Sequence, residues 1–66
     1  MPLSTRHKIT DQLKAARKAL ATCQYHLEYI VSLAEGQSPY IEKNVPAVLL
    51  ALKEMDDVLV AFREGL

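Results

Sequence analysis

The fold is decided by residues 9–34, which read ITDQLKAARKALATCQYHLEYIVSLA. Apolar or small residues recur in this stretch at alternating spacings of four and three, the a/d pattern of a packed helix. This first seam consists of Ile9, Leu13, Ala16, Leu20, Cys23, Leu27, Ile30 and Ala34. The pattern predicts a long amphipathic helix over about residues 5–35. Ser4 or Thr5 can cap its start, and Gly36 suits the left-handed conformation that ends many helices.

A second seam predicts a second helix over about residues 45–64, with Gly65 at its end. Its members are Val45, Val48, Leu52, Met55, Leu59, Phe62 and Leu66. The link, residues 36–44, contains a Ser-Pro pair that predicts one short helical turn over 39–43. Because a proline ring clashes with the carbonyl four residues earlier in a continuous helix, Pro46 predicts a break or kink near Asn44, which can cap the second helix.

The two seams predict an all-α fold, a single antiparallel hairpin domain. In a chain of 66 residues, one helix–helix interface has to offset an ordering cost of roughly 1.5 kcal/mol per residue. The single cysteine cannot form an internal disulfide. Since 50% of the residues are hydrophobic, we expect two hairpins to associate as a homodimeric four-helix bundle. We also expect a cytoplasmic protein, because the lone cysteine suits a reducing compartment and neither a signal peptide nor a membrane span is evident.

The charges are segregated along the chain although they balance overall. Residues 1–20 carry five basic residues and one acidic residue, a net charge of +4. Residues 21–66 carry three basic and seven acidic residues, a net charge of −4. An antiparallel hairpin would set the basic start of the first helix beside the acidic end of the second, so the simplest interpretation is complementarity within the fold. The alternative is that each charged surface is available to a partner.

Several residues that neither seam requires are candidates for binding another protein. Tyr25 and Tyr29 lie one turn apart, and tyrosine is enriched in surfaces that are half buried against a partner. Leu50 lies almost opposite the seam of its helix. Together with acidic and small residues further along the second helix it forms a second candidate set, which consists of Leu50, Glu54, Asp57 and Ala61. Dimer contact or simple exposure remain alternatives for the tyrosines, and solvation for the acidic residues.

Catalytic, cofactor and metal chemistry is not indicated. Cys23 and His26 have helical spacing, but zinc requires about four ligands and no further cluster is present. We therefore expect a non-enzymatic protein without a cofactor. Nucleic-acid binding is an alternative because the first helix begins with a basic cluster, Arg6, Lys8, Lys14, Arg17 and Lys18. The near-neutral pI of about 6.7 and the absence of aromatic residues in that cluster disfavour it.

The run DDVLVAFREG, with Asp57, Leu59, Ala61 and Arg63, resembles small phage-encoded anti-activators that disarm bacterial quorum-sensing regulators. This resemblance implies a dimeric two-helix protein that grips a host transcription regulator. In length and two-helix plan the chain is also similar to the helical-hairpin co-chaperones of type III secretion, which shield another secretion component. The sequence thus predicts a hairpin that inhibits or shields a partner protein, with a small assembly factor as a further alternative.

Overall fold

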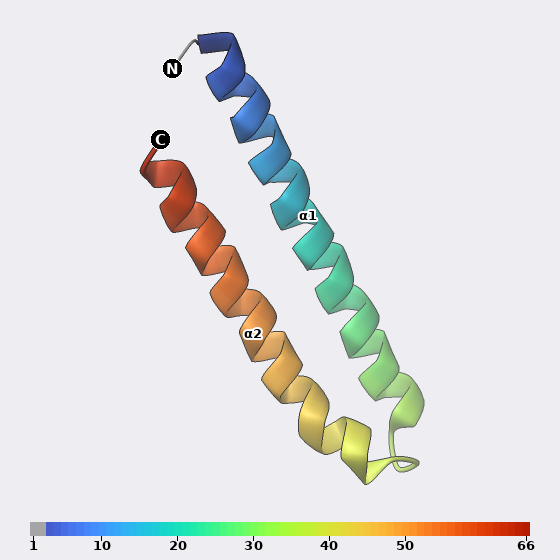
Figure 1. Ribbon diagram of the computed structural model, residues 1–66. Coiled ribbons are helices and arrows are strands. Elements are labelled where there is room, and N and C mark those ends of the chain that lie inside the picture. The colour runs from blue at the N-terminus through green and yellow to red at the C-terminus, as the bar shows by residue number, and fades with distance from the viewer. Residues whose placement is uncertain (1–2) are drawn as a thin grey trace.

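The computed structural model describes residues 3–66, which form two helices folded back on each other (Figure 1). Helix α1 spans Leu3–Ala34, 32 residues, and helix α2 spans Pro39–Glu64, 26 residues. Both ends of the chain lie together at one end of the hairpin, and the link lies at the other (Figure 1). The predicted all-α antiparallel hairpin is confirmed. Since α1 is already helical at Leu3, Ser4 and Thr5 lie inside the helix and do not cap it.

The turn between the helices is held by local hydrogen bonds. Gly36 adopts φ +72°, the left-handed conformation predicted for it, and its N–H donates to Glu42 Oε1 at 2.7 Å. Ser38 is extended and its Oγ accepts a hydrogen bond from the Ile41 N–H at 3.4 Å. Pro39 follows at the first helical position, where its missing N–H is not needed. Ser38 therefore caps the start of α2 by accepting from one of its free backbone N–H groups.

Of the break or kink expected near Asn44, the break is wrong, because α2 runs from Pro39 through Pro46 without interruption. Its first turns are stabilised by packing, since Val45 is buried and Ile41 is half-buried. This packing offsets the backbone hydrogen bond that Pro46 cannot donate. Asn44 does not cap a new helix; its Nδ2 donates to the Tyr40 carbonyl at 2.7 Å. The second helix consequently begins at Pro39 rather than at Val45.

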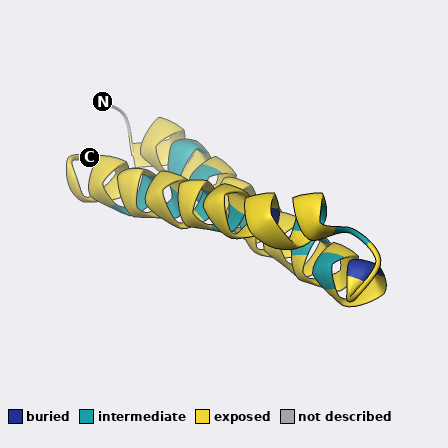
Figure 2. Ribbon diagram, turned by 90° about the horizontal axis from the view of Figure 1, so that it is seen from below, coloured by how far each residue is buried: buried dark blue, intermediate teal, exposed yellow. Residues whose placement is uncertain are grey.

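The hairpin is thin and buries little of itself. Its principal extents are 53 × 16 × 10 Å, and its radius of gyration is 15.8 Å, whereas a compact chain of this length would have about 11 Å. Only Ala34 and Val45 are buried among the described residues, and both lie towards the turn (Figure 2). The accessible surface is 5303 Å², roughly 1,100 Å² more than is typical of a globular monomer of this mass.

Candidate protein-interaction surface

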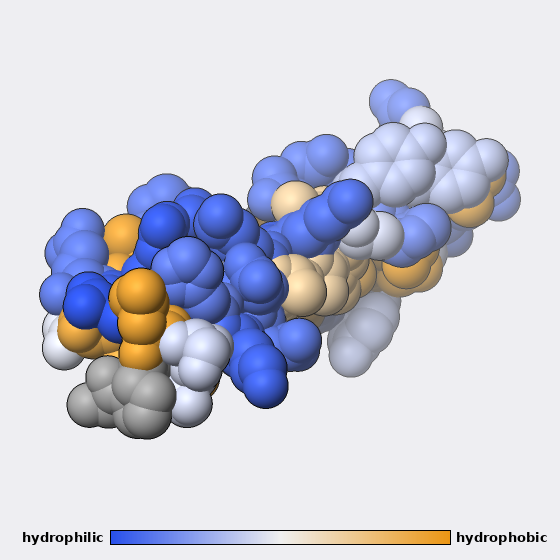
Figure 3. Space-filling model, turned by 90° about the horizontal axis from the view of Figure 1, so that it is seen from above, coloured by the Kyte–Doolittle hydropathy of each residue, from blue (hydrophilic) through white to orange (hydrophobic). Residues whose placement is uncertain are grey.

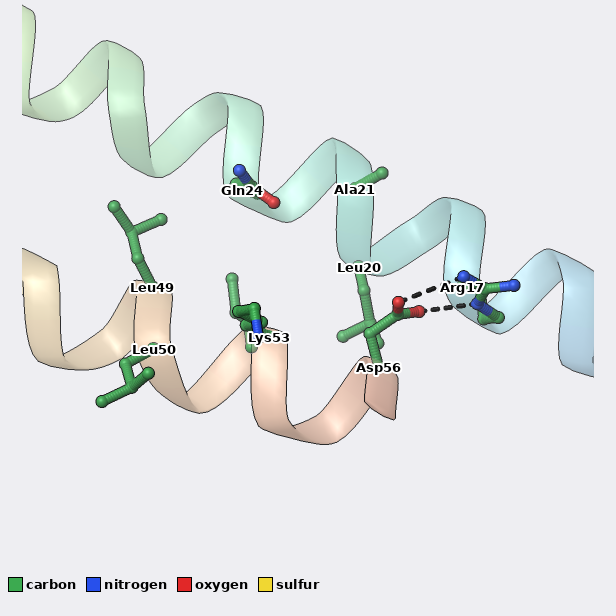
Figure 4. A pocket seen from close by; sticks show the side chains of 9 residues that line it. Arg17, Leu20, Ala21, Gln24, Leu49, Leu50, Lys53 and Asp56 are labelled. Atoms are coloured by element: carbon green, nitrogen blue, oxygen red, sulfur yellow. Dashed lines mark hydrogen bonds and ion pairs between the residues drawn. The ribbon is translucent and has the colours of Figure 1, made fainter. Parts of the chain in front are cut away.

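A line of leucines packs between the two helices. These inner leucines are Leu13, Leu20 and Leu27 on α1, and Leu52 and Leu59 on α2, all of them half-buried. They recur every seven residues, so they stay on one side of each helix. Figure 4 shows Leu20 and Leu49 between the two helices. The inner leucines are alternate members of the two predicted seams, which therefore supply the contact between the helices.

Polar side chains flank the inner leucines on one side. Arg17 Nε lies 2.7 Å from Asp56 Oδ1, and Arg17 Nη2 donates to Asp56 Oδ2 at 3.2 Å (Figure 4). Gln24 on α1 and Lys53 on α2 line the same hollow of about 660 Å³ between the helices, together with the apolar side chains of Leu49 and Leu50. We call this side, defined by Arg17, Gln24, Lys53 and Asp56, the polar face.

The ion pair shifts the protonation of both partners. The hydrogen bond from Arg17, supported by its positive charge, holds the pKa of the Asp56 carboxyl below its ordinary value, although partial desolvation opposes this. The hydrogen bond to Asp56 and its negative charge raise the pKa of Arg17. Both groups are therefore charged at neutral pH. The side chains of Arg17 and Asp56 keep 42% and 34% of their exposure, so solvent screens the attraction.

The other halves of the two seams lie on the opposite face. Cys23 lies about 60° round α1 from Leu20 in one direction, and Arg17 lies about as far in the other, because each residue turns the helix by about 100°. Met55 and Asp56 are related in the same way about Leu52 on α2. Since the Arg17–Asp56 pair joins the polar sides of both helices, the apolar sides must also lie together.

This second side is an open apolar face. Its large members are Ile30, Leu33, Val48, Met55, Val58 and Phe62, which are between 39% and 65% exposed. Small residues lie among them: Ala16, Ala19, Cys23 and Ala51. Towards the termini, a shallow hollow of about 300 Å³ continues the face beside Ile9 and Leu13. Large contiguous apolar surfaces are uncommon on monomeric proteins and indicate interaction sites.

The hairpin thus buries only part of the predicted core. Of the seam residues, Ala16, Cys23, Ile30, Val48, Met55 and Phe62 are exposed. Each helix has a single neighbour, and the centre of each seam points between that neighbour and the open side. Leu33 and Val58 were not in either seam, although Leu33 follows Ile30 and Val58 follows Met55 by three residues. That spacing on one helix face is the sequence signal for both.

The six residues expected to bind a partner are exposed, but a single hairpin does not bring them together. Tyr25 and Tyr29 are each two residues from Leu27, about 160° round α1 from the inner leucines. On α2, Leu50 and Glu54 are likewise two residues from Leu52, and Asp57 and Ala61 are two residues from Leu59. Figure 4 shows Leu50 pointing away from α1. The two groups occupy the outer surfaces of different helices and face opposite directions.

Charged groups gather at the end that carries both termini, where hydrophilic side chains dominate the surface (Figure 3). A hollow of about 450 Å³ is lined there by Arg6, His7, Lys14 and Arg63, together with Asp11. Among the described residues, the ion pairs are Arg17–Asp56 between the helices and Lys53–Asp57 within α2. The predicted complementarity within the fold is therefore realised by one pair, and most other charges face solvent.

Residues 3–66 carry neither a metal-binding cluster nor a membrane-spanning helix. This part of the chain contains no group of three or more His, Cys, Asp or Glu side chains placed to hold a metal ion. Cys23 is exposed and forms no disulfide bond. Neither described helix has a stretch both long and apolar enough to cross a bilayer.

Comparison of the chain with models of known families, with curated proteins and with solved structures finds no match.

Proposed function

We propose that this protein is a non-enzymatic, cytoplasmic binding protein that acts as a homodimeric four-helix bundle and inhibits or shields a partner protein. The observation that carries the proposal is the open apolar face. Six large apolar side chains lie there on the same side of two helices, with the exposed halves of both heptad seams. In a four-helix bundle, each helix directs its seam to a central core shared with two neighbours.

The exposed area supports a second copy as the occupant of this face. A standard protein interface buries about 800 Å² on each partner. The hairpin exposes roughly 1,100 Å² more than a globular monomer of its mass, which is enough for such an interface. A single helix–helix contact leaves little apolar burial to offset the ordering of the chain, so association also supplies missing stability.

The dimer is tested with a pair of matched variants. Phe62 and Leu50 are each 57% exposed on α2, but only Phe62 lies on the open apolar face. We expect Phe62→Asp to give a monomer with reduced helicity, because the charge would be buried between the protomers. Leu50→Asp should remain dimeric and helical. Sedimentation velocity and circular dichroism measure both properties; a wild-type monomer, or a Phe62→Asp protein that stays dimeric, would contradict this part of the proposal.

The role as an inhibitor or shield rests on the outer surfaces and on resemblance. The stretch of α2 that resembles phage anti-activators contains Asp57 and Ala61, which are exposed on its outer surface. Aromatic residues such as Tyr25 and Tyr29 are common anchors in protein interfaces. The resemblance favours a host transcription regulator as the partner. A secretion component or an assembly intermediate is the alternative partner for the same surfaces.

Partner binding is tested by affinity capture from host lysate with mass spectrometry. The tagged wild-type protein should retain one regulator in stoichiometric amount, and both Leu50→Asp and Tyr25→Ala should lose it while remaining dimeric. A virion or secretion component in its place would favour the alternative partner. If the captured protein is retained equally by all three forms, the outer surfaces do not bind it and this part of the proposal fails.

A further inference from the structure

The two helices contribute side chains of unequal size to the open apolar face. On the middle of α1, the face consists of Ala16, Ala19 and Cys23, all small. On α2 it consists of the small Ala51 and of Met55, Val58 and Phe62, which are large and more than half exposed. In the stretch where Ala16 and Ala19 lie opposite Met55 and Val58, the face is therefore shallow along α1 and raised along α2.

These unequal sides lie at the same level along the hairpin. The Arg17–Asp56 pair places residue 17 of α1 beside residue 56 of α2. Because the helices are antiparallel, Ala16 and Ala19 lie level with the stretch of α2 that contains Met55 and Val58. If α1 of one copy packs against α2 of another with both hairpins pointing the same way, the small residues of one copy therefore lie opposite the large residues of the other.

Two fully overlapped copies can meet through this face in two symmetric ways. A two-fold axis parallel to the helices keeps both hairpins pointing the same way and places α1 of each copy against α2 of the other. An axis perpendicular to the helices places α1 on α1 and α2 on α2. The perpendicular arrangement opposes small residues to small ones, which leaves cavities, and large residues to large ones, which overpacks the core. The parallel arrangement interdigitates them at native packing density.

The charges favour the same arrangement. The first half of α1 carries Lys8, Lys14 and Lys18, which are exposed, and the second half of α2 carries Glu54, Asp57 and Glu64, also exposed. Under the parallel axis, the basic half of each α1 lies beside the acidic half of the partner's α2, as it does beside its own. Exposed pairs add little energy, but complementary charge suppresses wrong alignments.

We infer that two copies of the protein associate about a two-fold axis parallel to the helices, with α1 of each packed against α2 of the other and both links at one end. This inference rests on the proposed homodimer and specifies its geometry. It has a consequence for partner binding, because the outer surface of α1 then adjoins the outer surface of the other copy's α2. Tyr25 and Tyr29 of one copy would share an edge of the bundle with Leu50 and Glu54 of the other.

The arrangement is tested by distances between nitroxide labels at single cysteines. Cys23→Ser removes the native thiol, and Gln37→Cys or Ser4→Cys then carries the label at the link end or at the open end of the full chain. Both positions are exposed. With neighbouring helices about 10 Å apart, the parallel axis predicts label distances of roughly 15–30 Å at both sites by double electron–electron resonance. The perpendicular axis separates each pair by nearly the 53 Å length of the hairpin.

The outcomes separate this inference from the proposal on which it depends. Short distances at both sites support the parallel axis. A long distance at either site, in a sample that sedimentation shows to be dimeric, overturns the parallel axis and leaves the homodimer standing. Absence of any coupling between protomers, with a monomeric mass for wild type and for the Cys23→Ser parent, overturns the homodimer as well.

Discussion

Arg17 and Asp56 form the ion pair that joins the two helices, with Nε and Oδ1 2.7 Å apart. Arg17 follows Leu13 by four residues and Asp56 follows Leu52 by four, so each lies beside the seam of its helix, at a position that often carries a charged side chain. The pair therefore marks one side of the hairpin as polar. The opposite side keeps the apolar half of both seams, and this asymmetry underlies the predicted dimer.

Acid should weaken the hairpin through Asp56. The folded pKa of this carboxyl lies below its unfolded value, so the pair contributes stability that is fully present above the unfolded pKa of about 3.9. This contribution is lost as the pH falls through the lower folded pKa. We expect the Tm of wild type to exceed that of Asp56→Asn at pH 7, and the difference to vanish in strong acid. A difference in Tm that is the same at both extremes of pH would contradict the role of the ion pair.

A charge among the inner leucines should unfold the chain. Leu59 is half-buried between the helices, and Leu59→Asp would place a carboxylate without a partner in the apolar contact. We expect loss of the helical circular dichroism signal at 25 °C, and the same result for Leu20→Asp. Leu50→Asp, on the outer surface of the same helix, provides the control and should stay helical. A folded, soluble Leu59→Asp protein would show that the register of α2 is different.

Enlarging the shallow side of the open apolar face should weaken the dimer. Ala16 and Ala21 are both exposed on α1, but Ala21 lines the hollow of the polar face. Overpacking a core costs about 1–3 kcal/mol, so Ala16→Leu should raise the dimer dissociation constant by roughly 5- to 150-fold. Ala21→Leu should leave it unchanged. Sedimentation equilibrium measures both constants, and equal values for the two variants would argue that Ala16 is not at the interface.

Removing the proline inside α2 should stabilise the protein. Pro46→Ala restores the N–H that can donate to the Glu42 carbonyl and relieves the clash of the ring with the preceding turn. Proline is about 3 kcal/mol less favourable than alanine in a helix interior, and we expect on the order of 2 kcal/mol of this to appear in the free energy of unfolding. Chemical denaturation measures the change. An unchanged or lower stability would mean that Pro46 limits the unfolded chain more than it strains the helix.

The sequence was sufficient to predict the helices and their pairing, because heptad spacing determines which face of a helix becomes apolar. It also predicted the caps at Gly36 and Ser38, whose residue types match the conformations they adopt. The start of α2 could not be predicted in this way. Local chemistry at Asn44 and Pro46 favours a break, whereas the packing of Ile41 and Val45 on α1, which no local pattern records, keeps the helix continuous.

The candidate site was predicted in its parts but not in its geometry. The periodicity identified Met55 and Phe62 as seam residues, and the structure shows that they are exposed when each helix has one neighbour. Spacing alone cannot say how many neighbours a helix has, because the same a/d pattern serves pairs and bundles. The sequence pattern also could not predict that Tyr25 and Leu50 lie on opposite sides of the hairpin, since this depends on which faces of the two helices point outwards.

The position of Ala34 and Val45 determines how the hairpin opens. Both buried residues lie towards the turn, and the end that carries the termini has no buried residue among those described. Local unfolding begins where few apolar groups are buried, so the helices should separate first at the end that carries the termini. When the helices pair again, the contacts nearest the turn should form first. Amide hydrogens near Leu3 and Glu64 would therefore exchange early, and those beside the turn late. A partner that covers the terminal end would slow this fraying without touching the turn itself.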